Sequence, residues 1–111
     1  YIQAQRRRTE LLEEIEIALS EYDVIITTAM LTPQPPLDDK APFPFLDVPM
    51  IAVPFNLTLH PVQTVRAGFF NDGMPIGAQI VGRNWDEATV LKVAHSFEKE
   101  AGLLKRFPDL S

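Results

Sequence analysis

Residues 69–98, FFNDGMPIGAQIVGRNWDEATVLKVAHSFE, constrain the fold more than any other part of the sequence, because they predict a turn, a strand and a helix in succession. Asp72 and Gly73 favour a tight turn, since Asp-Gly readily takes the positive φ angles that short hairpins need. Residues 62–69 before the turn are rich in β-branched side chains, and residues 76–82 follow it as a second apolar run. We therefore predict a β-hairpin.

A helix is predicted directly after the hairpin. Asn84 is a candidate N-cap, with Glu87 three residues later as its capping-box partner. Gly102 is expected to end the helix, because glycine commonly takes the left-handed conformation at a helix C-terminus. The apolar side chains between these ends recur at the spacing of an amphipathic helix, and they are Val90, Leu91, Val93, Ala94, Phe97 and Ala101.

The N-terminal part of the chain predicts a helix followed by a strand. Residues 1–21 carry apolar side chains at spacings of three and four, which with the adjoining tyrosine are Leu11, Leu12, Ile15, Ala18, Leu19 and Tyr22. Residues 23–29, DVIITTA, are β-branched and almost wholly apolar or hydroxyl-bearing, which predicts a strand buried on both faces. This order favours an α/β fold, with a sheet flanked by helices.

Residues 31–55 are predicted to form a long loop. Seven of the ten prolines fall between Pro33 and Pro54. Proline fixes φ and lacks an N–H donor, so we expect neither a helix nor a central strand here. Loops of this length inside a compact domain are usually functional or mobile.

Composition limits the class of protein. The chain of 111 residues allows one domain, placed at 1–111, and it lacks cysteine, which excludes disulfides and cysteine-based zinc sites. A net charge of −5 without a basic stripe argues against a nucleic-acid partner. No apolar run approaches the roughly 20 residues needed to span a membrane, and no signal peptide is visible, so we expect a cytoplasmic protein. Because the chain begins with Tyr1, we expect it to be a piece of a longer protein.

Candidate nucleophiles and ligands are few. Ser96 and Lys99 have the Ser-x-x-Lys spacing of penicillin-binding enzymes, but the predicted position late in a helix lacks any partner motif, so we interpret them as ordinary helix residues. His95 is interpreted as a surface or half-buried helix histidine and not as a metal ligand. His60 lies before Pro61 in a predicted loop and is the better site candidate, yet general acid–base work needs an oriented partner that the sequence does not supply.

The remaining polar residues support no metal or cofactor. The loop acids Asp38, Asp39 and Asp47 lack the alternation and the glycine of a calcium loop. Asn56-Leu57-Thr58 has the form of a glycosylation sequon, which we interpret as structural, with Asn56 and Thr58 hydrogen-bonded to loop backbone. We therefore assign no catalytic residue, metal ligand or cofactor from the residues alone.

Four ordered motifs resemble the amidase signature family of hydrolases. Residues 1–8, YIQAQRRR, resemble its Tyr-x-x-Ala-Gln-Arg helix, and residues 23–27, DVIIT, resemble its Asp-Val-Leu-Leu-Thr-Pro strand. Residues 55–61 resemble its Phe-Asn-Leu-Thr-Gly-x-Pro segment. Residues 73–88 resemble its Gly-Leu-Pro-x-Gly-x-Gln-x-x-Gly strand and the Asp-Glu helix start that follows.

The resemblance implies the C-terminal region of an enzyme that hydrolyses amide carbon–nitrogen bonds through two serines and a lysine. Those residues belong to a Gly/Ser-rich signature that this chain lacks, so no catalytic residue is carried over. The implied fold is the C-terminal portion of a mixed sheet flanked by helices. The resemblance also implies that the segments around Thr27, Thr28, Asn56, Thr58 and His60 border a pocket for a small-molecule amide substrate.

The chain departs from the family pattern near that pocket. Thr28 replaces a proline, and Leu59 stands where the family has a glycine, which would allow a positive φ angle or close backbone approach. His60, Gln63 and Arg66 replace mostly apolar or proline positions. Gln63 and Arg66 either provide polar specificity or are surface residues, and we favour the surface interpretation because exposed Arg and Gln are common.

Two hypotheses for function follow. In the first, the chain is part of an amidase and is inactive alone, because it holds no nucleophile with an activating base. In the second, it is a non-enzymatic module for binding or assembly. Under the second hypothesis, unpaired strand edges and apolar patches favour self-association, so the isolated chain is expected to be a homo-oligomer.

Overall fold

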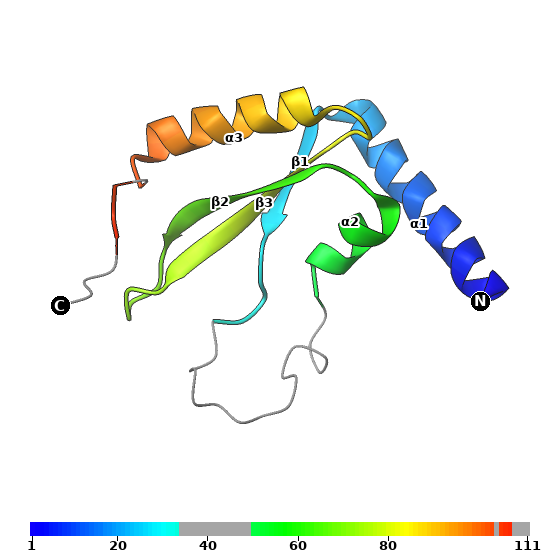
Figure 1. The fold of residues 1–111 in the computed structure, drawn as a ribbon, viewed down its shortest axis with the longest axis horizontal. Helices are drawn as coiled ribbons and strands as arrows, with labels where there is room; N and C mark the ends of the chain where they lie inside the picture. The colour runs from blue at the N-terminus through cyan, green and yellow to red at the C-terminus, as the bar shows by residue number, and fades with distance from the viewer. Residues whose placement is uncertain (34–49, 104, 108–111) are drawn as a thin grey trace.

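The computed structural model describes residues 1–33, 50–103 and 105–107 (Figure 1). Most of the predicted proline-rich loop and the last four residues therefore lie outside the described residues. The elements in chain order are α1 (Ile2–Glu21), β1 (Val24–Thr28), α2 (Ala52–Thr58), β2 (Val62–Phe69), β3 (Pro75–Gly82) and α3 (Glu87–Ala101). This mixture of helices and a sheet confirms the predicted α/β class.

The three strands form one antiparallel sheet in the order β1-β3-β2. The predicted hairpin of β2 and β3 is confirmed, and its turn is closed by hydrogen bonds from the N–H of Phe70 to the carbonyl of Met74 and from the N–H of Gly73 to the carbonyl of Phe70. Gly73 has a φ of 86°, a conformation that a glycine adopts without steric penalty. A register shift between Arg66 and Gly68 marks an irregularity in β2.

β3 is the central strand, and both of its faces are buried. Consecutive side chains of a strand point to opposite faces, and Ile80 and Val81 are both fully buried. On one face Ile80 packs with Val65 of β2 and with α3 through Val90 and Ala94. On the other face, Val81 packs with a cluster from α1 and α2, which consists of Ile15, Leu19 and Phe55. Two small cores therefore lie on opposite sides of one strand.

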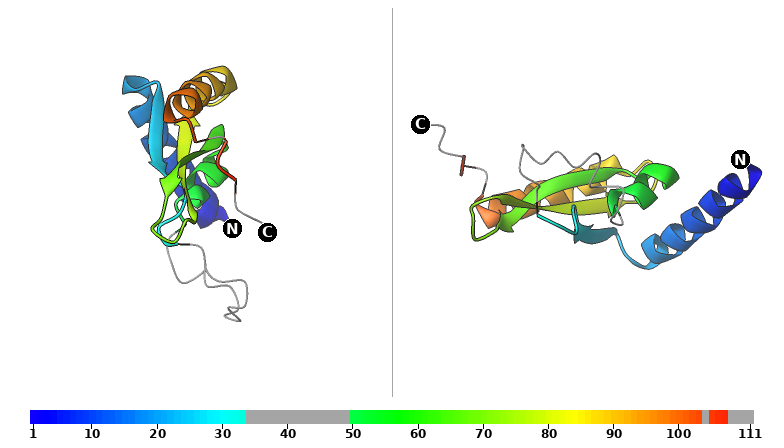
Figure 2. Two further views of the ribbon diagram at one scale, coloured as in Figure 1. Left: turned by 90° about the vertical axis from the view of Figure 1, so that its left-hand side faces the viewer. Right: turned by 90° about the horizontal axis from the view of Figure 1, so that it is seen from below.

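β1 is the strand whose predicted environment is wrong. It was expected to be buried on both faces, but Ile26 is 62% exposed. The reason is the layout of the helices, because α3 packs on β2 and β3 and leaves β1 at the border of the described sheet (Figure 2). Ile26 is therefore the one exposed residue of β1, while Val24, Ile25, Thr27 and Thr28 are half-buried.

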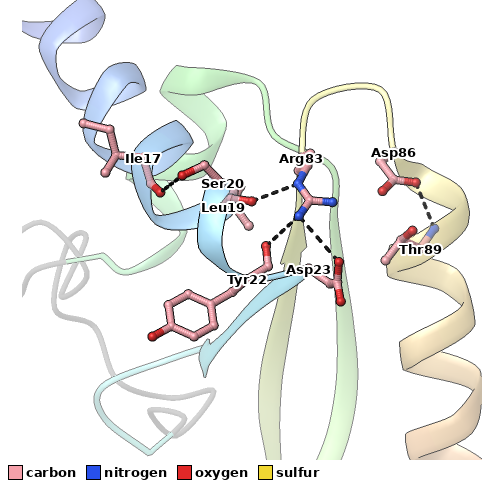
Figure 3. Close-up of polar contacts among 8 residues, drawn as sticks. All are labelled: Ile17, Leu19, Ser20, Tyr22, Asp23, Arg83, Asp86 and Thr89. Carbon is pink, nitrogen blue, oxygen red and sulfur yellow. Dashed lines mark hydrogen bonds and ion pairs between the residues drawn. The ribbon is translucent and has the colours of Figure 1, made fainter.

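α1 agrees with its predicted bounds, and its apolar face is narrower than predicted. Ile15 and Leu19 are buried, whereas Tyr22 is exposed at the end of the helix. Arg83, which follows β3, holds this end of α1 (Figure 3). Its Nε donates to the carbonyl of Leu19 at 2.8 Å and its Nη2 donates to the carbonyl of Tyr22 at 3.1 Å. These bonds satisfy carbonyls that a helix C-terminus leaves without partners.

α2 was not predicted, because its residues were assigned to a loop on account of the neighbouring prolines. Pro54 is the third residue of α2, within the first turn. The N–H groups of a first turn have no partner inside the helix, so proline removes no hydrogen bond there. The helix ends at Leu59, whose φ of 61° and ψ of 28° are left-handed.

α3 has its predicted C-terminus and a different N-cap. Gly102 ends the helix with a φ of 64°, as expected. The N-cap is Asp86 and not Asn84, since the Asp86 carboxylate accepts a hydrogen bond from the N–H of Thr89 at 3.3 Å (Figure 3). Asn84 instead donates through Nδ2 to Glu16 of α1 at 3.0 Å.

Of the helices in the described part of the chain, none combines the length and apolar character that a bilayer crossing requires.

Candidate functional site

A pocket of about 410 Å³ lies where β1 ends beside the β2–β3 hairpin. The two segments are joined by the hydrogen bond from the N–H of Ala29 to the carbonyl of Gly77 at 2.9 Å. Gly77 keeps this approach open, because a Cβ there would lie 3.0 Å from the Cβ of Ala29. The pocket is lined by Thr28, Ala29, Met30, Thr32, Thr64, Val65, Arg66, Phe70, Pro75, Ile76 and Gly77. Its volume is in the range of small-molecule sites.

The wall that β1 contributes to this pocket is fixed by polar bonds. Gln79 of β3 is buried and its Nε2 donates to the carbonyl of Thr28 at 3.0 Å. The Thr28 hydroxyl donates to the carbonyl of Met30 at 2.6 Å. A buried amide is tolerated only when it is hydrogen-bonded, so Gln79 ties the last residue of β1 to the central strand. Gln79 belongs to the sequence motif of residues 73–88, but the sequence does not predict its hydrogen bond to Thr28.

Arg66 is half-buried and lines the pocket. Its Nη1 donates to the carbonyl of Leu103 at 3.0 Å and to the carbonyl of Arg106 at 2.6 Å. Its guanidinium carbon lies 5.5 Å from the ring centroid of Phe69, and that of Arg106 lies 3.9 Å from the same ring. These contacts hold the segment after α3 against β2 and fix the guanidinium. Gln63, in contrast, bonds only the neighbouring carbonyl of Thr64 among the described residues.

His60 lies in a separate buried polar cluster. Its side chain is inaccessible to solvent, its Nδ1 lies 2.7 Å from the hydroxyl of Thr58, and its Nε2 lies 3.3 Å from a carboxylate oxygen of Glu16. The Nε2 contact does not have hydrogen-bonding geometry. His60 is therefore paired with Thr58 through Nδ1, while its Nε2 has no hydrogen-bonded partner among the described residues. Since the same Glu16 oxygen accepts from Asn84, this cluster connects α1, the end of α2 and the segment before α3.

The five residues predicted to border a pocket do not converge in the described structure. Thr28 lines the pocket, and Thr27 precedes it within β1. Asn56 is exposed on α2, and no bond of its side chain to loop backbone appears among the described contacts. Thr58 and His60 are buried beside α1, and the Thr58 hydroxyl donates to the carbonyl of Pro54 at 2.9 Å, inside the helix and not in a loop. Among the described residues, these five side chains therefore lie in two separate regions.

The candidate nucleophiles of the described residues have no activating base. The Ser20 hydroxyl donates to the carbonyl of Ile17 at 2.6 Å, within α1 (Figure 3). Ser96, Lys99 and His95 are exposed on α3, in agreement with their interpretation as helix residues. Within the described ranges, no group of three or more histidines and acids is placed to hold a metal ion. The described residues therefore form a pocket wall and do not include a serine nucleophile paired with an activating base.

Comparison with known proteins identifies the family to which the chain belongs. The sequence model of the amidase family matches residues 1–91. The chain belongs to the amidase family.

The relatives are components of one kind of enzyme. The chain is 39% identical to the A subunit of glutamyl-tRNA(Gln) amidotransferase of Brevibacillus brevis over 114 aligned positions, and 37% identical to that of Geobacillus thermodenitrificans over 112. These matches cover 98% and 99% of this chain and 23% of each relative. The chain therefore spans about a quarter of the length of the relatives that it matches.

A solved structure confirms the fold. The crystal structure of the A subunit of glutamyl-tRNA(Gln) amidotransferase from Thermotoga maritima superposes with a TM-score of 0.76 at 30% sequence identity. The superposition covers 87% of this chain and 22% of that protein. The arrangement of helices around β1, β3 and β2 is thus shared with a segment of an amidase-family protein.

Proposed function

We propose that this chain forms the C-terminal region of an amidase-like hydrolase that cleaves carbon–nitrogen amide bonds. The nucleophilic serine, the second serine and the lysine of that enzyme are proposed to lie outside these residues, so the isolated chain is expected to be inactive. The observation that carries the proposal is the family match over residues 1–91. The two described serines support the expected inactivity, because neither contacts a base that would activate it.

The proposed contribution of this region is to complete a sheet and to form one wall of a substrate pocket. Amide hydrolysis requires a nucleophile, a base and donors for the oxyanion, all held around the scissile bond. We propose that the pocket at the end of β1 faces those groups. Thr28 lines it directly. Thr27, Asn56, Thr58 and His60 remain proposed border residues of the complete enzyme.

A chimera tests this proposal. In the amidase-family relative from Brevibacillus brevis, the 23% of the chain that aligns here would be replaced by this sequence. We expect the chimera to release ammonia from an amide substrate, while the isolated chain releases none. A matched chimera carrying Ile80→Asp, which places a charge between two packed layers, should fail to fold. A well-folded chimera without amide hydrolysis, or ammonia release by the isolated chain, would contradict the proposal.

The alternative is a non-enzymatic module for binding or assembly, and the observation that favours it is the environment of β1. In the described residues β1 pairs with β3 on one side only, and Ile26 is 62% exposed. Strands with an open apolar edge tend to pair with further chains. We therefore propose that the isolated chain forms homo-oligomers. Light scattering should show a dimer or larger species. Ile26→Lys should reduce it to a monomer, whereas the control Ile17→Lys, on the exposed side of α1, should leave it unchanged. A monomeric unsubstituted chain would refute self-association.

Protein partners of the complete enzyme are also part of the proposal. The relatives are named as subunits, which supports a partner protein for this chain. A small-molecule amide as substrate, the absence of a nucleic-acid partner and a cytoplasmic location stay predictions. Immunoblotting of fractionated source cells would determine the location and the size of the native polypeptide.

A further inference from the structure

We propose that the pocket at the end of β1 binds a small organic anion, with the anion's carboxylate paired to Arg66 and a short apolar body packed against Phe70 and Ile76. This binding property goes beyond the proposed hydrolase function. It belongs to the described residues themselves and does not depend on whether any amide is cleaved.

The charge of the pocket wall supports an anionic ligand. Arg66 is half-buried in that wall, and in the described part of the chain no carboxylate lies within 4 Å of its guanidinium. The same holds for Arg106, which shares the ring of Phe69 with it. In a chain whose net charge is −5, two cations without a carboxylate partner among the described residues meet at this edge of β2. A partly desolvated cation without a counter-charge favours an anion at the same place.

The guanidinium of Arg66 is also preorganised for binding. Two backbone carbonyls accept from its Nη1, and the ring of Phe69 supports it. The carbonyls are neutral, so they orient the side chain without cancelling its charge. Among the described residues, Nε and Nη2 have no bonded acceptor, which leaves N–H groups for a ligand. A guanidinium held in this way can bind a planar carboxylate through two parallel hydrogen bonds.

The other walls of the pocket match a short aliphatic carboxylate. Thr64 contributes a hydroxyl, while the hydroxyl of Thr28 already donates to Met30. Phe70 and Ile76 supply apolar surface, and no acidic side chain is among the described residues that line the pocket. One cation, a hydroxyl and an apolar floor fit a carboxylate with an aliphatic chain. The volume of about 410 Å³ is large enough for such a molecule.

NMR titration of the isotope-labelled 111-residue chain tests the proposal, with butyrate as the anion and butyramide as its neutral isostere. We expect butyrate to give saturable shifts of the amides of Ala29, Thr64 and Gly77, and we expect raised salt to weaken them. Butyramide should bind about tenfold more weakly, because it lacks the charge-assisted pair. Equal shifts with the two compounds, or shifts that do not saturate, would overturn the proposal.

Variants assign the effect to Arg66. Arg66→Gln should lower butyrate affinity about tenfold, whereas Arg7→Gln, which removes the same charge from the exposed surface of α1, should leave it unchanged. Wild-type affinity in a folded Arg66→Gln variant would refute the assignment. If that variant does not fold, Thr64→Val decides, because it leaves the contacts of Arg66 intact. It should weaken butyrate about threefold, and unchanged affinity would likewise refute the site.

Discussion

Replacing Leu59 by glycine and by alanine measures the strain stored at the end of α2. Leu59 has a φ of 61° and a ψ of 28°, a left-handed conformation in which a Cβ is crowded by the backbone. The side chain is 71% exposed, so its truncation removes little packing. Both substitutions remove the same side-chain contacts beyond Cβ. The difference in their unfolding free energies therefore isolates the backbone contribution.

The magnitude follows from two opposing terms. A left-handed residue with a Cβ costs about 1–2 kcal/mol, and glycine is free of that penalty. Glycine gives back about 0.4–1 kcal/mol, because it increases the conformational entropy of the unfolded chain. We expect Leu59→Gly to be more stable than Leu59→Ala by roughly 0.8 kcal/mol, or about 4 °C in melting temperature for a domain of this size.

Urea unfolding followed by far-ultraviolet circular dichroism measures the difference. A matched control exists in the same chain, since Gly102 ends α3 at a φ of 64° and a Cβ added there meets no atom within 4 Å. Gly102→Ala should destabilise by a similar roughly 0.8 kcal/mol. If Gly102→Ala is destabilising while the two Leu59 variants are equally stable, the strain assigned to Leu59 is absent and the reasoning fails.

Three further predictions concern the packing and capping of the other elements. Gly82→Ala should lower stability by about 1–3 kcal/mol in urea unfolding, because its Cβ would collide with a buried valine of α3; Gly68→Ala, whose Cβ has 4.0 Å of clearance, should be nearly neutral. Arg83→Met should cost about 1.5–3 kcal/mol in chemical denaturation, because it leaves the carbonyls of Leu19 and Tyr22 unpaired. Asp23→Asn should change little, because the ion pair between Asp23 and Arg83, 3.5 Å apart, is solvent-exposed. Asp86→Ala should cost about 1 kcal/mol and increase amide exchange in the first turn of α3.

The hairpin and the long helices could be predicted because their determinants are local. Asp-Gly at the turn, β-branched runs beside it and a glycine after the last helix act over a few residues. The N-cap of α3 was assigned wrongly for a non-local reason. Asn84 and Asp86 are both suitable caps by residue type, and the choice is made by Glu16, which bonds Asn84 from a distant part of the chain.

The site was predicted less completely than the fold. Thr28 could be placed at a pocket through the family resemblance, but Arg66 could not, because nothing in the sequence next to it indicates that its partners are the carbonyls of residues 103 and 106. His60 was considered isolated, although its Nδ1 lies 2.7 Å from the hydroxyl of Thr58, only two residues away. Contacts between residues far apart in the sequence decide the placement of Arg66, and periodicity carries no information about them.

The position of β3 between its two partners has a consequence for how the protein is made. β2 precedes β3 by one short turn, whereas each residue of β1 lies roughly 50 positions before its pairing partner in β3. The entropic penalty of closing the loop between β1 and β3 grows with the logarithm of that separation. During synthesis, β1 leaves the ribosome long before the strand that it pairs with. Its sequence VIITT cannot pair fully with β3 until residue 82 has emerged. Nascent chains arrested in that interval should therefore be the ones that chaperones retain.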